Sequence, residues 1–278
     1  MTTRMDEKLK ALLASLNRLS SARSQFPATI PCKVCGAEAQ FYDVVDFNKI
    51  ASEPDFYPFG RSGVTVAWHR CGACDFLFTT FFDDWSSDDF RRFVYNADYE
   101  LIDQEYEYTR PKHTADHLSE LLRGFENLRI LDYGSGSGTF ARCMSDKSFC
   151  RVEQYDPFSH PNRPAGTFAI VVCYEVIEHS TSPLGTLSDM SSLLDDDGCM
   201  IVGQTLQPHD INLLRANWWY CAPRNGHCST YTGRTLAKLC GQLGLLFHCG
   251  SPIVIKHRHS PAGDVLVQRL NLGEAWVT

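Results

Sequence analysis

The sequence has no excess of basic residues. Its 26 lysine and arginine residues are outnumbered by 33 aspartate and glutamate residues, which gives a formal net charge of −7. A protein that binds nucleic acid through charge needs clustered lysine and arginine to displace counterions from the phosphates. The composition therefore argues against nucleic acid as a general partner.

The sequence also lacks a long apolar run. No segment approaches the roughly 20 apolar residues that a membrane-spanning helix needs. The first residues carry Asp6, Glu7 and Lys8 where a secretory signal peptide would have its apolar core. We therefore expect a cytoplasmic protein with no membrane partner.

The apolar pattern predicts one large domain with a smaller appendage. Met5, Leu9, Leu12 and Leu16 recur at helical spacing, so we expect a helix over residues 5–20 that serves as a packing arm or as a contact in a homodimer. The chain divides into an arm over 1–30, a small unit over 31–82, a connecting region over 83–114 and a large domain over 115–278.

Strand and helix patterns alternate along the large domain. We expect strands at 128–132, 151–155, 168–173 and 199–203, helices from 138, at 183–194 and at 233–243, and two late strands near 252–257 and 264–270. This alternation predicts an α/β fold with a doubly wound, mostly parallel sheet. The proline-rich stretch 157–167 is too short for a strand and a helix, so one repeating unit is reduced.

Twelve cysteines are present, and four of them form two C-x-x-C pairs: Cys32, Cys35, Cys71 and Cys74. Four thiolates at this spacing fit a tetrahedral zinc ion with Zn–S distances of about 2.3 Å. All four positions would be protein ligands, so the zinc would be structural and would fold residues 31–82. The alternative is four reduced cysteines in a small core. The other eight cysteines stand singly, and we assign them no metal.

A glycine-rich turn follows the first strand of the large domain. Asp132 ends the strand, Gly134, Gly136 and Gly138 form the turn, and a helix begins directly after it. A strand, a glycine turn and a helix N-terminus together make a cofactor crevice. The order G-x-G-x-G differs from the dinucleotide fingerprint, and Asp132 would repel a pyrophosphate but attract an ammonium group.

Residues 130–138 resemble the first motif of the class I S-adenosylmethionine-dependent methyltransferase superfamily. Asp156 ends the next strand, where such folds place a carboxylate on the ribose hydroxyls; an ordinary capping aspartate is the alternative. Residues 168–179, which end in E-V-I-E-H, are similar to the fourth-strand motif of the superfamily. The resemblance implies a Rossmann-like, seven-stranded-type sheet, S-adenosylmethionine as cofactor and S-adenosylhomocysteine as product.

The resemblance also implies a set of cofactor-binding residues. Arg110 would reach the methionyl carboxylate from a segment that covers the cofactor, or it would simply pack in a linker. Glu175 would orient the cofactor or the acceptor. The implied set is Tyr106, Arg110, Asp132, Gly134, Ser135, Gly136, Gly138, Asp156, Cys173 and Glu175.

The aromatic stretch 218–231 reads as an irregular loop, and loops of this kind carry function. It resembles the substrate loop of bacterial methyltransferases of sugar and polysaccharide pathways; one sugar C-methyltransferase family also has an N-terminal zinc segment and a histidine similar to His227. A histidine with an ordinary pKa near 6.5 suits a general base. The catalytic candidates are His227, Glu175 and His179; His227 as a capping or surface residue and His179 as a loop support are the alternatives.

The expected acceptor is a small polar molecule such as a sugar or a nucleotide sugar. The chain has no counterpart of the long C-terminal domain of that sugar C-methyltransferase family, which leaves O-, N- and C-methylation open. One alternative is an RNA or protein methyltransferase whose zinc knuckle grips the substrate; the acidic composition and the lack of an N-P-P-Y run argue against it. The other is a non-catalytic cofactor-binding module, against which the intact glycines argue.

Overall fold

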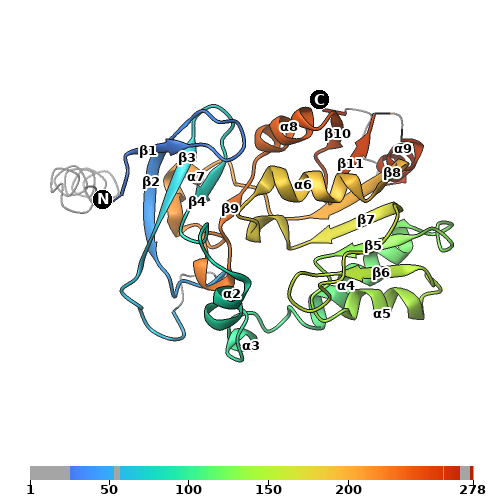
Figure 1. Cartoon of the computed structure of the whole chain (residues 1–278), viewed down its shortest axis with the longest axis horizontal. Coiled ribbons are helices and arrows are strands. Elements are labelled where there is room, and N and C mark those ends of the chain that lie inside the picture. The colour runs from blue at the N-terminus through green and yellow to red at the C-terminus, as the bar shows by residue number, and fades with distance from the viewer. Residues whose placement is uncertain (1–25, 53–56, 259, 270–275, 278) are drawn as a thin grey trace, which may run out of the picture.

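The computed structural model describes residues 26–52, 57–258, 260–269 and 276–277. The helix predicted over residues 5–20 lies outside these residues. Two sheets lie side by side, the smaller one built from the N-terminal part of the chain and the larger one from the C-terminal part (Figure 1). Among the described residues, no helix has the length and apolar character needed to cross a membrane.

The smaller sheet has five strands in the order β1-β2-β3-β4-β9. Its strands are β1 (Thr29–Pro31), β2 (Glu38–Asp46), β3 (Thr65–Cys71), β4 (Leu77–Thr79) and β9 (Ser229–Thr230). All four pairings are antiparallel. The last strand comes from a segment about 150 positions later in the chain, so this sheet is not confined to residues 31–82.

The larger sheet has six strands in the order β10-β11-β8-β7-β5-β6. They are β5 (Ile130–Tyr133), β6 (Val152–Tyr155), β7 (Phe168–Tyr174), β8 (Leu194–Gly203), β10 (Leu245–His248) and β11 (Ile253–His257). The pairs β5·β6, β5·β7 and β7·β8 are parallel, and β11 is antiparallel to both β8 and β10. The doubly wound, mostly parallel sheet is confirmed. Its edge is β6, and residues 157–167 after it hold no strand or helix, as predicted.

Helices cover both faces of the larger sheet. They are α4 (Thr109–Leu121), α5 (Thr139–Asp146), α6 (Pro183–Ser192), α8 (Gly233–Gln242) and α9 (Pro261–Arg269). Strand β7 shows why two layers form, since Val171 and Cys173 pack into the cluster with α6 and α8, while Ile170 and Val172 pack into the cluster with α4, α5 and α9. Side chains alternate across a strand, so a strand with no polar face is buried on both sides.

Two predictions at the C-terminal end were wrong in detail. Residues 264–270 were predicted as a strand, but residues 261–269 form helix α9. The apolar, β-branched run V-L-V is typical of a strand, yet Pro261 at the first helical position and Asp264 in the first turn favour a helix. Strand β10 was not predicted, because its four residues LLFH directly follow the turn that ends α8.

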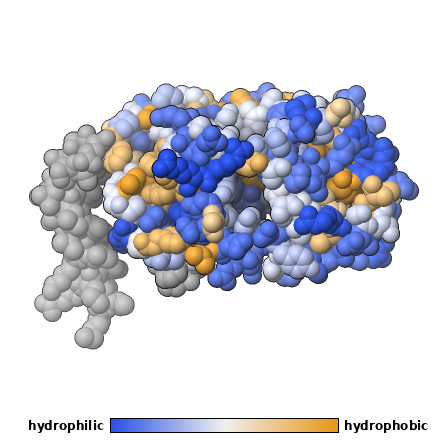
Figure 2. Space-filling view, turned by 60° about the horizontal axis from the view of Figure 1, so that its bottom comes forward, coloured by the Kyte–Doolittle hydropathy of each residue, from blue (hydrophilic) through white to orange (hydrophobic). Residues whose placement is uncertain are grey.

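Short helices join the two sheets. They are α2 (Ser87–Phe93), α3 (Tyr99–Ile102), α7 (Ile211–Leu214) and the one-turn 3₁₀ segments η2 (Ile177–His179), η3 (Arg215–Asn217) and η4 (Pro223–Asn225). The carboxyl ends of the parallel strands point toward the smaller sheet (Figure 1). A hollow opens between the two parts on the face shown in Figure 2. Open α/β sheets bind their ligands at this edge.

Candidate functional site

The four predicted cysteines come together at one point of the smaller sheet. Their sulfur atoms all lie within 4.8 Å of one another, with Cys32 Sγ 3.6 Å from Cys74 Sγ and Cys35 Sγ 3.5 Å from Cys71 Sγ. None of the four forms a disulfide. Sulfurs on a tetrahedron about 2.3 Å from a zinc ion would be about 3.8 Å apart, so the arrangement fits the metal.

Each cysteine pair forms a tight knuckle. The Val34 amide points at Cys32 Sγ at 3.4 Å, and Gly36 adopts a φ of +73°, which glycine reaches without strain. The bond shared with Cys74 lowers the pKa of Cys32 to about 5 and raises that of Cys74. A metal ion that binds here would displace the protons of the thiols.

The glycine turn after β5 has the backbone that the motif requires. Gly134, Gly136 and Gly138 all have positive φ angles, of +81°, +49° and +75°. A Cβ atom at Gly134 would lie 2.3 Å from Val176 Cγ2, whereas one at Gly136 would meet nothing within 4 Å. Gly134 is therefore required by the close packing of Val176. Gly136 faces open space, in which a ligand could approach the backbone.

This contrast gives a prediction for two alanine variants. Gly134→Ala should destabilise the fold by roughly 1–3 kcal/mol through the clash and the positive φ. Gly136→Ala should lower cofactor affinity more than stability, because its methyl group enters the open space. Thermal unfolding and calorimetric cofactor titration of both variants measure the two effects. Equal losses in both properties for both variants would contradict the assignment.

Two predicted carboxylates flank the glycine turn. Asp132 is the penultimate residue of β5 and is 7% exposed, and burial together with the charge of Asp156 raises the pKa of its carboxyl group to about 8. Its Oδ2 has no hydrogen-bond partner among the described residues. A buried, unpaired carboxyl oxygen is costly unless a ligand satisfies it, so Asp132 fits a cationic or hydrogen-bond-donating ligand.

Asp156 follows β6 and is engaged by backbone amides. Its Oδ1 accepts from the amides of Phe158 and Ser159 at 2.8 and 2.9 Å, and its Oδ2 accepts from the amide of Gly136 at 3.2 Å. The capping role weighed from the sequence is therefore present. The bond to Gly136 also places this carboxylate beside the open part of the turn.

The remaining predicted cofactor residues have different surroundings. Arg110 pairs with Asp103 at 2.7 Å, and Tyr106 packs edge-on against Tyr99 with ring centroids 4.9 Å apart. Ser135 is buried in the glycine turn, with its Oγ 3.3 Å from His160 Nδ1. Cys173 is buried in the core on β7, and burial together with the charges of Glu178, Asp132 and Glu175 raises the pKa of its thiol.

The E-V-I-E-H motif forms the turn after β7. Glu175 has a φ of +53°, which is rare for a residue other than glycine and is found where a site holds strained backbone. Burial raises the pKa of Glu175, while the charge of Arg110 opposes that rise. Glu175 and Arg110 are thus electrostatically coupled at the sheet edge.

The stretch 218–231 is mostly irregular but almost wholly buried, and residues 220–231 are all buried. His227 is 5% exposed, which excludes the surface role weighed from the sequence. Its Nδ1 lies 2.8 Å from the carbonyl oxygen of Tyr220. A carbonyl can only accept, so Nδ1 carries the hydrogen and Nε2 keeps a free lone pair. Burial lowers the pKa of His227 to about 4, so the ring is neutral near pH 7.

His179 lies beside His227, with ring centroids 4.9 Å apart. Its Nδ1 is 3.1 Å from the hydroxyl of Tyr95, and burial lowers its pKa well below the usual value. One ligand atom from each of Glu178, His179 and His227 lies within 4.8 Å of the others. The structure therefore brings the two predicted histidines together with a carboxyl group.

Glu178 and two tyrosines that contact this cluster were not predicted as site residues. Glu178 lies inside the E-V-I-E-H motif, and the presence of a second acid in that motif could have indicated it. Tyr220 lies in the aromatic loop seven residues before His227, which could have indicated a contact between them. Tyr95 gave no signal, because only the fold brings it to His179.

The N-terminal part of the chain holds the His227 loop in place. Lys49 is fully buried, and its Nζ donates to the carbonyls of Ala216 and Trp218 at 2.8 Å each. Strand β9, two residues after His227, pairs with β4, and β4 begins three residues after Cys74. The cysteine cluster is therefore connected through one strand pair to the loop that carries His227.

A family model described as a methyltransferase domain matches residues 106–248. That stretch contains the glycine turn, Asp156, the E-V-I-E-H turn and the His227 loop, and it covers more than half of the chain. The chain belongs to the methyltransferase domain family. No curated protein sequence matches it.

Several solved structures are similar to this methyltransferase domain protein, each with a low sequence identity to it. An O-methyltransferase family protein from Burkholderia thailandensis is 14% identical with a TM-score of 0.46, over 63% of this chain and 64% of that one. An O-methyltransferase of neocarzinostatin biosynthesis, in complex with S-adenosylhomocysteine and a dihydroxynaphthoic acid, is 13% identical with a TM-score of 0.35, over 54% and 57%. Magnesium protoporphyrin IX methyltransferase from Synechocystis is 14% identical with a TM-score of 0.37, over 63% and 96%. This chain thus spans less than two thirds of the first two proteins.

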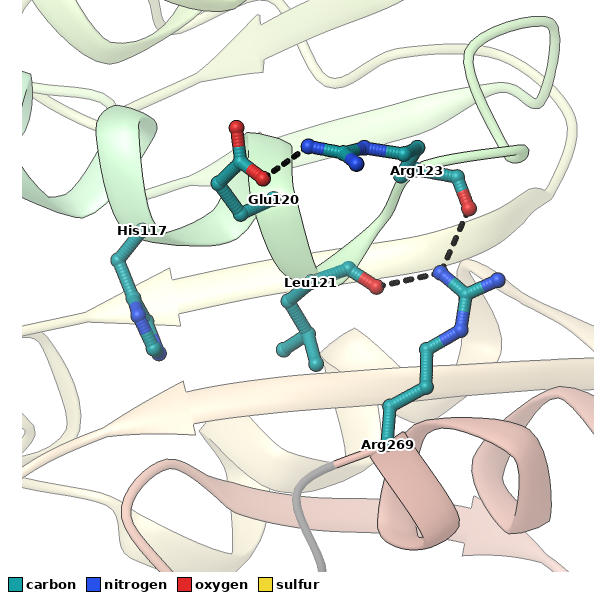
Figure 3. A pocket seen from close by; sticks show the side chains of 5 residues that line it. All are labelled: His117, Glu120, Leu121, Arg123 and Arg269. Atoms are coloured by element: carbon teal, nitrogen blue, oxygen red, sulfur yellow. Dashed lines mark hydrogen bonds and ion pairs between the residues drawn. The ribbon is translucent and has the colours of Figure 1, made fainter.

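One surface pocket of this methyltransferase domain protein lies away from the glycine turn. It has a volume of about 460 Å³ and is lined by His117, Glu120, Leu121, Arg123 and Arg269 from the α4 and α9 side (Figure 3). Arg269 Nη1 donates to the carbonyls of Leu121 and Arg123, and Arg123 pairs with Glu120. Its two arginines are engaged by these neighbours and none of the predicted site residues lines it, so we do not assign the active site to it.

Proposed function

We propose that this chain is an S-adenosylmethionine-dependent methyltransferase that acts on a small polar acceptor, of the sugar or nucleotide-sugar type. The observation that carries the proposal is a neutral, buried His227 with a free Nε2, beside His179 in the turn after β7. Membership of the methyltransferase domain family supports the reaction class. Hydroxyl-rich acceptors fit the polar groups gathered around the two histidines.

The cofactor side of the proposal uses the edge of β5 and β6. The open space at Gly136 admits the ligand, Asp132 offers an unpaired carboxyl oxygen, and Asp156 stands beside the turn. The cofactor carries a positive sulfonium and ammonium, which suit buried carboxyl groups. When bound, it supplies the methyl group, and Arg110 and Glu175 would orient its charged end.

The predicted effect of Asp156→Ala follows from this arrangement. The substitution removes charge-assisted hydrogen bonds worth roughly 1.5–3 kcal/mol, so cofactor affinity should fall about ten-fold or more. Asp156→Asn is the matched control, since it keeps the shape and part of the contact to the amides of residues 158 and 159. Calorimetry measures both variants, and unchanged affinity in Asp156→Ala would reject the ribose-binding role.

The acceptor side uses the 218–231 loop. Methyl transfer is an in-line displacement whose barrier falls mainly by holding the acceptor in line, while a base removes its proton. His227 is the proposed base, and its Nε2 would receive the proton. His179 is the competing group, held by Tyr95 in the same cluster.

We further propose that Cys32, Cys35, Cys71 and Cys74 hold one zinc ion. A closed set of four thiolates leaves no coordination position for water, so the metal would act on folding and not on chemistry. Its folding role would extend beyond residues 31–82, because Thr235 Oγ1 of α8 donates to the carbonyl of Cys74 at 2.8 Å.

The reaction can be tested by measuring S-adenosylhomocysteine release by the purified protein. We expect release that depends on an acceptor in a panel of nucleotide sugars and sugars. A panel arm with tRNA and a salt-dependent gel shift tests the nucleic-acid alternative. Acceptor-dependent release with RNA alone would contradict the small-molecule assignment.

A further inference from the structure

Glu178 joins the two sides of the turn that carries His227. It is fully buried in η2, directly after the cofactor edge of β7. Its Oε1 accepts a hydrogen bond from the hydroxyl of Tyr220 at 2.5 Å, and its backbone carbonyl accepts from the amide of Cys228 at 2.8 Å. Tyr220 and Cys228 lie on either side of His227 in the sequence, so Glu178 fixes both ends of the turn.

Tyr220 is the second part of this connection. Its ring is 1% exposed and packs on the His227 ring, with centroids 4.4 Å apart. Its carbonyl is the acceptor that requires His227 to carry its hydrogen on Nδ1. One residue therefore contacts His227 through its ring and its backbone, while its hydroxyl is held by Glu178.

Such an arrangement selects one of the two neutral forms of the imidazole. In water the hydrogen exchanges between Nδ1 and Nε2, and a base that must use Nε2 is productive only when Nδ1 is protonated. A buried hydrogen bond to the non-reacting nitrogen also fixes the orientation of the ring.

We propose that Glu178 and Tyr220 are positioning residues that hold His227 with Nδ1 protonated and Nε2 free. The effect on catalysis rests on the proposed function. The position of the hydrogen on the His227 ring does not, because it can be measured without an acceptor. Glu178 acts through its acceptor oxygen, so a residue that accepts the Tyr220 hydroxyl can replace it. Neither residue needs to touch the acceptor or the cofactor.

The test compares four variants by nitrogen NMR of ¹⁵N-histidine-labelled protein, with the His227 signals identified by their loss in His227→Gln. Wild type and Glu178→Gln should show a protonated Nδ1 and a free Nε2. Tyr220→Phe and Glu178→Leu should show a mixture of the two forms. Tyr231→Phe is the matched control, because Tyr231 is equally buried and its hydroxyl donates to Ile177 in the same turn without contacting His227.

Kinetics give the second readout on an acceptor found by the release screen. Tyr220→Phe and Glu178→Leu should lower kcat about ten-fold or more while the cofactor Kd stays within about two-fold, and Glu178→Gln should restore most of kcat. Wild-type ring signals in Tyr220→Phe would overturn the proposal, as would a mixture of forms in Tyr231→Phe. A changed ring state with unchanged kcat would instead uphold the positioning role and count against His227 as the base.

Discussion

Replacing His227 with alanine should lower turnover about 10²–10⁴-fold, the usual contribution of a positioned general base, while cofactor affinity stays nearly intact. The expectation follows from the position of His227, which lies on the acceptor loop and not on the glycine turn. His179→Ala is the matched comparison, since His179 lies in the motif turn after β7 and its loss should disturb cofactor binding as well as rate. Steady-state kinetics and calorimetry on both variants separate the two roles.

The pH dependence follows from the lowered pKa of His227. A base works when it is unprotonated, so the rate should be flat between pH 6 and 8 and should fall as the pH drops toward the value of about 4. The same shift affects stability, because the pKa of an unfolded histidine is about 6.5. The burial of the neutral ring therefore has no pH-dependent cost above about pH 6.5. The free energy of unfolding decreases as the pH falls from there toward 4, because the unfolded state binds the proton more tightly. A His227→Ala variant with the wild-type rate across pH 6 to 8 would place the base elsewhere.

Removing the zinc ion proposed for the cysteine cluster should abolish methyl transfer while much of the cofactor affinity remains. Strand β4 begins three residues after Cys74 and pairs with β9, which follows His227 by two residues. A disordered knuckle would therefore release the loop of the proposed base. The glycine turn and Asp156 belong to the other sheet and would stay in place.

The measurement uses the Cys74→Ser variant and chelator-treated wild type, each with metal analysis, cofactor calorimetry and activity. We expect one zinc per chain in the wild type and activity below about 1% without it. Cys150→Ser is the control, because Cys150 is exposed and lies far along the chain from the cluster. Retained cofactor binding shows that the larger sheet remains folded. Fully active protein without zinc would contradict the structural role.

The sequence was most informative where one local pattern determines structure. Strands β5, β6, β7 and β11 were predicted near their observed bounds. The clearest case is β7, because a strand buried on both faces has an apolar run between turns as its sequence. The cysteine quartet was predicted because its spacing is itself the geometric requirement. Helix α9 was predicted as a strand because the short run V-L-V is compatible with a helix and with a strand. Only the packing of Leu266 and Val267 against the core decides between the two.

Long-range contacts in the site could not be read from the sequence. Nothing in Ser229–Thr230 shows that these two residues complete a sheet begun 200 positions earlier. The same holds for Tyr220 and Glu178, whose hydrogen bond joins residues 42 positions apart. His227 itself was predicted from the composition of its loop and from the resemblance of that loop to the substrate loop of sugar-pathway methyltransferases, but its burial and its ring state depend on contacts that only the fold creates.

The most direct test of the account is hydrogen–deuterium exchange of the purified protein with and without S-adenosylmethionine. The account predicts slower exchange in residues 132–140 and 153–160, with no change in the pocket between α4 and α9. Protection at the α4–α9 pocket, or no protection of the glycine turn at a saturating cofactor concentration, would contradict it.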